Sequence, residues 1–140
     1  MKSQKLIRTA ATVFILLSAF CFLSVSLMAF QNPQAVMDLV GVKLTNTDAY
    51  SSIRGVYGGV GLTIFISLIY LLRRNKLEAL SLLSILWGMY AFSRLITIIV
   101  DGALGNFGTQ WLVLEGIFFA IAICTYILHK KRLFKASTIH

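Results

Sequence analysis

Residues 9–30, TAATVFILLSAFCFLSVSLMAF, decide the fold of this chain, because no charged side chain interrupts them. A helix needs about 20 consecutive apolar residues to cross the hydrocarbon core of a bilayer. Lys2, Lys5 and Arg8 precede this stretch, a start that is also typical of a signal peptide. The apolar part of a signal peptide is only about 7–15 residues long and ends at small residues. Residues 27–30, Leu-Met-Ala-Phe, do not fit such an end, so we predict an uncleaved membrane-spanning helix.

Three further apolar stretches follow, and they predict helices over residues 51–72, 78–100 and 110–128. The chain has 140 residues, of which 58% are hydrophobic and 13% charged. Soluble domains carry about a quarter charged residues. We therefore predict an all-α fold, an integral membrane four-helix bundle in which residues 1–140 form a single membrane domain.

The positions of the basic residues predict the orientation of the bundle. Ten of the thirteen lie in three clusters that adjoin apolar stretches. These clusters are Lys2, Lys5 and Arg8; Arg73, Arg74 and Lys76; and Lys130, Lys131, Arg132 and Lys135. Basic flanks of spans stay in the cytoplasm, so both termini are predicted to be cytoplasmic. The net charge of +8 does not indicate a nucleic-acid partner, because the chain has no separate basic face.

The external loop, residues 31–50, has a pattern of its own. Asn32 and Pro33 are typical of a helix cap and a first helical position. Gly41 can end the turn that follows, and the residues between form one apolar side. That side consists of Val36, Met37, Leu39 and Val40. We expect a short helix that lies in the membrane interface.

Charged residues inside the spans are the strongest indication of a functional site. Arg54, Arg94 and Glu115 fall within three different predicted helices, and Asp101 follows the third. A charge in hydrocarbon is costly and is kept when it is paired or lines a polar cavity. Counted from the external ends, the three lie about 5–10 Å inside. We predict that they meet in one layer, with Arg94 and Glu115 as partners.

Helical spacing assigns neighbours to this polar layer. Tyr57, Tyr90 and Trp111 are predicted to flank it, and Arg54, Tyr57, Gly58 and Gly61 are expected on one side of the second helix. Small residues allow close helix packing in membranes. The candidates for such packing are Gly55, Gly58, Gly59, Ser84 and Gly88.

Other chemistry finds little support. No His or Cys lies beside an acid at the spacing of a metal site, and no serine has the partners of a hydrolase. Glycines 55–61 lack the preceding strand and the Gly-Lys-Ser/Thr ending of a phosphate loop. We therefore predict no catalytic residue, metal or cofactor. Acid or base chemistry at Glu115 or Asp101 is the enzymatic alternative.

Several of these residues form a pattern that resembles a known family. The stretch 53–62, IRGVYGGVGL, together with a central Arg94, Asp101-Gly102 and Leu114-Glu115, is similar to the bacterial membrane family named domain of unknown function 4345. The resemblance implies a small four-helix protein of a bacterial membrane. It also implies a functional set, namely Arg54, Tyr57, Gly58, Gly59, Arg94, Asp101, Gly102 and Glu115. It implies no activity.

The leading hypothesis is a non-enzymatic inner-membrane protein with a charged pocket in the outer leaflet. The pocket would bind a small anionic ligand, a lipid headgroup or a partner helix. A second hypothesis is an accessory subunit of a larger membrane complex, and a third is a small-solute or proton-coupled transporter that acts as an oligomer. The expected partners are membrane lipids, another membrane protein or further copies of the chain.

Overall fold

The computed structural model describes residues 2–137, with side chains from Lys5 to Lys131. Lys2, Arg132 and Lys135 of the basic clusters lie outside the described side chains. Within residues 2–137 the chain is helical and contains no strand. Four segments are long and apolar enough to cross a membrane. They are Lys5–Gln31, Thr47–Arg74, Lys76–Val100 and Asn106–Lys131. The predicted all-α fold with four spans is thus confirmed, while the orientation of the termini stays a prediction.

The chain divides into two compact units. One comprises residues 16–73, and the other comprises the described residues up to 15 and from 74 onwards. Each unit is built around a pair of spans. The single domain expected from the sequence stays a prediction.

Helix α1, Lys2–Gln31, begins upstream of the apolar stretch, because lysine and arginine are good helix formers. Buried residues recur along it at steps of three and four, which marks one face. They include Ala11, Ile15, Ser18, Phe22, Ser26 and Ala29.

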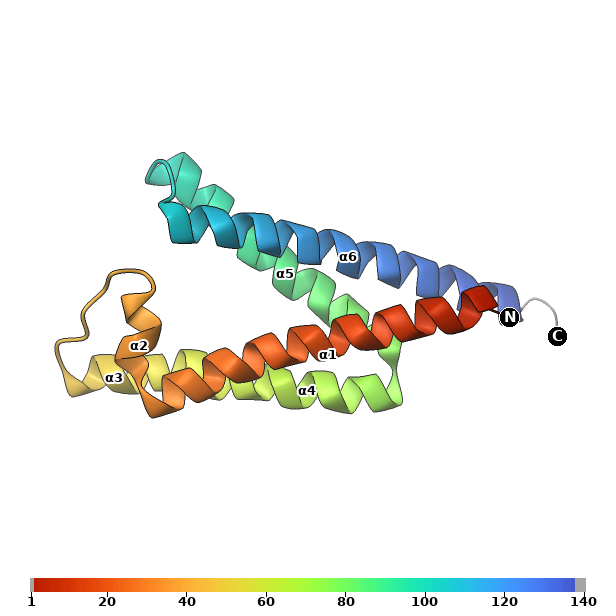
Figure 1. The fold of residues 1–140 in the computed structure, drawn as a ribbon, viewed down its shortest axis with the longest axis horizontal. Helices are drawn as coiled ribbons and strands as arrows, with labels where there is room; N and C mark the ends of the chain where they lie inside the picture. Colours follow the sequence, from red (N-terminus) through yellow and green to blue (C-terminus); the bar gives the residue numbers. More distant parts are fainter. Residues whose placement is uncertain (1, 138–140) are drawn as a thin grey trace. The chain divides into compact units, whose positions relative to one another are not determined.

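The second span in the unit of residues 16–73 is not a single α-helix. It consists of α3 (Thr47–Ile53), a π-helix η1 (Arg54–Val60) and α4 (Gly61–Arg74). The side chain of Asn46 accepts a hydrogen bond of 2.8 Å from the backbone N–H of Ala49, and this cap starts α3 earlier than predicted. Figure 1 shows α3 and α4 running beside the later part of α1.

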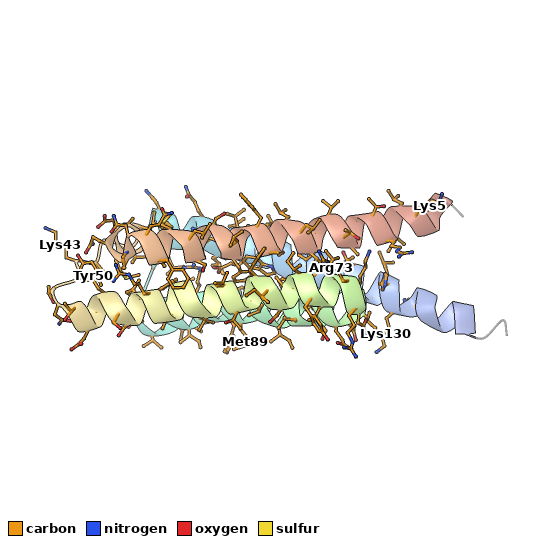
Figure 2. The ribbon with its side chains drawn as sticks, turned by 90° about the horizontal axis from the view of Figure 1, so that it is seen from below. Lys5, Lys43, Tyr50, Arg73, Met89 and Lys130 are labelled. Carbon is orange, nitrogen blue, oxygen red and sulfur yellow. The ribbon has the colours of Figure 1, made fainter. Side chains whose placement is uncertain are left out.

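The loop between these spans folds back on their ends. Its short helix α2, Pro33–Asp38, starts after an extended Asn32, as the sequence predicted, and Gly41 has a φ of +70°. Val36 and Met37 are buried beside Ala29. The four apolar residues expected on one interfacial side are therefore divided, because Leu39 and Val40 follow the helix and are exposed. Figure 2 shows Lys43 and Tyr50 at the loop end of this unit and Arg73 at the opposite end.

The other unit contains the helical pair α5 (Lys76–Val100) and α6 (Asn106–Ser137), which lie side by side in Figure 1. The side chain of Asn75 caps α5 by accepting a bond of 3.1 Å from the N–H of Leu77. Gly102, with a φ of +101°, follows the end of α5 in a conformation that favours glycine. Helix α6 continues past its predicted end at 128, because basic residues are good helix formers and suit a helix C-terminus.

Candidate functional site

A two-point ion pair joins α5 to α6. Nε of Arg94 donates to Oε2 of Glu115 at 2.7 Å, and Nη2 donates to Oε1 at 2.9 Å. The Glu115 side chain is 3% exposed and that of Arg94 is 23% exposed. Paired hydrogen bonds of this kind fix the guanidinium plane as well as neutralising both charges. The partnership expected from depth and helical phase is present in the structure.

Close packing on one side of this pair holds the two helices together. A Cβ atom on Gly88 would lie 2.8 Å from Cε2 of Phe119, so only glycine lets the ring rest on the α5 backbone there. The rings of Trp87 and Phe118 meet edge to face with centroids 4.8 Å apart. Gly88 therefore packs against a side chain of its own chain. Ser84, the other small residue predicted on α5, donates its hydroxyl to the carbonyl of Leu80 within the helix.

Two aromatic residues lie one helical turn along the chain from the members of the pair. Tyr90 precedes Arg94 by a turn and is 43% exposed. Trp111 precedes Glu115 by a turn and is half-buried. The centroid of its ring lies 6.1 Å from that of Phe107. That the two rings flank the ion pair stays a prediction, based on their spacing along the helices.

Asp101 occupies the end of α5, two turns beyond Arg94, and is exposed. Its backbone N–H donates to the carbonyl of Thr97 at 2.8 Å. The negative end of the helix dipole does not favour a carboxylate at this position. Helix stability alone therefore does not account for an acid here.

Arg54 lies in the unit of residues 16–73, at the start of the π-helix. Its Nε donates to the carbonyl of Phe30 at 3.3 Å. Phe30 is the second-last residue of α1, where carbonyls have no partner within the helix. Arg54 thus caps α1 with a favourable charge. Arg94 and Glu115 belong to the other unit, so the convergence of all three charges in one layer stays a prediction.

The face predicted for the second helix stays a prediction. Gly58 and Gly61 are buried, whereas Arg54 and Tyr57 are exposed. Arg54 and Gly58 nevertheless both contact Phe30 of α1. The π-helix has wider turns than an α-helix, so a spacing of 3.6 residues per turn does not fix the phase between α3 and α4. Whether Tyr57 flanks the same site as Tyr90 and Trp111 also stays a prediction.

Gly58 is the centre of the contact between α1 and the π-helix. Its carbonyl accepts a hydrogen bond of 2.6 Å from the hydroxyl of Ser26, which is buried. A Cβ on Gly58 would lie 2.9 Å from the ring of Phe30, and one on Gly61 would lie 3.2 Å from Cβ of Ser26. Sequence reasoning missed Ser26. The available signal was the helical spacing of its hydroxyl from that of Ser18 within a largely apolar span.

The remaining two glycines behave differently from Gly58. A Cβ on Gly55 would meet nothing within 4 Å, and one on Gly59 would meet only the carbonyl of Arg54 at 4.0 Å. The close packing predicted for them is therefore not seen within the unit of residues 16–73. Both contribute instead to a π-helix that has little side-chain bulk on one side.

These features define a multi-pass α-helical membrane protein in which an ion pair links two of the spans. The model of the family described as "Domain of unknown function (DUF4345)" matches residues 10–128, and the chain belongs to that family. The match includes both the π-helix and the Arg94–Glu115 pair. No curated protein and no solved structure matches the chain.

Proposed function

We propose that this protein binds an anionic group at Arg94, in the outer leaflet of a bacterial inner membrane. The observation that supports this most directly is the difference in exposure within the ion pair. Glu115 is buried and uses two N–H groups of the guanidinium. Arginine has five such donors. The others are available to a phosphate or carboxylate that approaches from the exposed side.

In this proposal Glu115 orients the arginine and does not act on the ligand. A guanidinium held by two hydrogen bonds has already lost its side-chain freedom, so binding costs less entropy. Without a ligand, the pair is neutral and therefore tolerable in a membrane. With an anion bound, the site carries one net negative charge, which an additional cation would offset. Asp101, two turns beyond Arg94 on α5, would lie at the rim.

The aromatic residues suit a ligand at the level of the lipid headgroups. Tyrosine and tryptophan are enriched at this level, because each has an apolar ring with a polar atom. Tyr90 and Trp111 flank Arg94 and Glu115 at one turn's distance. A headgroup phosphate is therefore the preferred ligand, and a small soluble carboxylate is the alternative source of the same chemistry.

Lipid analysis of the purified protein tests this proposal. The double variant Arg94→Gln with Glu115→Gln removes both charges. It leaves no unpaired charge in the membrane, so we expect it to fold. Arg73→Gln is the control, because Arg73 lies on the second span, at the end opposite to the loop that carries Lys43 and Tyr50. We expect native mass spectrometry to show bound phosphatidylglycerol for the wild type and the control, and its loss from the double variant. Undiminished lipid binding by a helical double variant would overturn the proposal. If the species bound to the wild type were displaced by acetate but not by added lipid, the ligand would be a soluble carboxylate.

A role as an accessory subunit is the second candidate, and the exposed π-helix favours it. Gly55 has open space around it, and the neighbouring Val56 and Tyr57 are exposed. Small residues of this kind let a partner helix approach closely. Stoichiometric co-purification with another membrane chain, abolished by Gly55→Leu but not by Gly116→Leu, would support this role. Recovery of the chain without such a partner would argue against it.

A further inference from the structure

The loop between the first two spans carries a compact exposed apolar tip. Leu39, Val40 and Val42 are 48%, 53% and 48% exposed, and Gly41 turns the chain between them. Complete burial of an aliphatic side chain is worth about 1.5–3 kcal/mol relative to exposure to water. Three half-exposed aliphatic side chains at one turn therefore lose part of this free energy in water.

The tip is held in place by the rest of the loop. The side-chain amide of Gln34 donates to Oδ1 of Asp38 at 2.7 Å and to the carbonyl of Val42 at 2.9 Å. Its oxygen accepts from the N–H of Leu44 at 2.9 Å. One side chain thus closes the turn from both sides. The exposed aliphatic residues are presented by an ordered structure.

The loop also lies close to the ends of the spans. Val36 and Met37 form a buried cluster with Ala29 of α1, and Leu44 and Ile53 pack against it. Ala29 and Ile53 belong to the segments that are able to cross the membrane. The loop is therefore packed against the ends of these two segments, which is where a tip has to lie to reach lipid.

We propose that the tip formed by residues 39–42 inserts into the lipid interface, with Lys43 contacting anionic headgroups. Lys43 is the positive charge that directly follows the tip, while Asp38, whose carboxylate accepts from Gln34, lies on the α2 side of the turn. Interfacial segments commonly combine buried aliphatic residues with adjacent basic ones. The interfacial element is therefore the turn after α2. The helix α2 itself buries Val36 and Met37 in the protein core.

Spin labelling in lipid vesicles tests this insertion. Cys21 and Cys124 are first replaced by alanine, and a nitroxide is then attached through Val40→Cys or, as the control, Thr45→Cys. Thr45 is an exposed polar residue of the same loop. Oxygen concentrates in lipid, whereas a charged nickel complex stays in water. We expect relaxation by oxygen to dominate at residue 40 and relaxation by nickel to dominate at residue 45.

Two other outcomes would overturn the proposal. Equal access of nickel to both labels would show that the tip stays in water. Protection of residue 40 from both reagents would show that protein covers it. The contribution of Lys43 is measured by comparing phosphatidylglycerol with phosphatidylcholine vesicles. We expect the oxygen preference at residue 40 to rise in the anionic vesicles and this rise to be lost with Lys43→Gln.

Discussion

A Cβ atom added to Gly88 of α5 would lie 2.8 Å from Cε2 of Phe119 on α6. At this point the contact between the helices is a ring resting on bare backbone. Such an approach is how membrane helices maximise their van der Waals contact, since lipid offers no hydrophobic force between them. The Arg94–Glu115 pair lies on the same two helices, so its geometry depends on this contact.

The first prediction concerns that contact. Gly88→Val should reduce the free energy of unfolding by about 1–3 kcal/mol, because the added side chain overpacks the site. Gly116→Val is the matched control on α6, where a Cβ would meet nothing within 4 Å. Thermal unfolding in detergent, followed by circular dichroism, compares the two. Equal stability of both variants would contradict the packing described here.

The two members of the ion pair should respond unequally to substitution. Arg94→Met leaves the buried Glu115 carboxylate without a partner, a loss of about 3–5 kcal/mol in comparable buried pairs. Glu115→Met leaves an arginine that is already partly exposed and can extend towards water, so it should cost less. The same unfolding measurement applies to both. A larger loss for Glu115→Met would show that the carboxylate is not the more deeply buried partner.

Ser26 offers a test of the contact between α1 and the π-helix. Ser26→Ala removes the hydroxyl that donates to the carbonyl of Gly58. Hydrogen bonds between membrane helices average about 0.6 kcal/mol and reach about 1.7, and a loss in this range is expected. Ser24→Ala is the control, because the Ser24 hydroxyl bonds within its own helix to Phe20. Equal stabilities of the two variants would show that the Ser26 hydrogen bond does not stabilise this contact.

Gln34→Ala should loosen the loop between the first two spans without affecting the spans themselves. The variant loses the three hydrogen bonds that close the turn around residues 38–44. Trypsin then gains access to Lys43, the basic residue of this loop. Faster cleavage after Lys43 at unchanged helicity is the expected result, and Gln110→Ala serves as the exposed control. Cleavage at the wild-type rate would show that Gln34 does not brace the loop.

Much of the fold follows from local sequence. Apolar stretches of span length predict the four membrane helices, and Asn32-Pro33 predicts where α2 starts. Arg94 and Glu115 could be paired in advance, because both lie on regular α-helices at similar depth. The second span could not be treated in this way. Its π-helical bonding is associated with contacts from α1, made by Ser26 and Phe30, and no periodicity within residues 51–72 encodes those contacts.

The bond from Arg54 to the Phe30 carbonyl bears on how the protein is made. The two residues are separated by 24 positions. Arg54, which caps the first span, is therefore synthesised only after the turn and α3. Until then, the C-terminal end of α1 lacks this partner. Biogenesis should therefore favour entry of the first two spans into the bilayer as one hairpin.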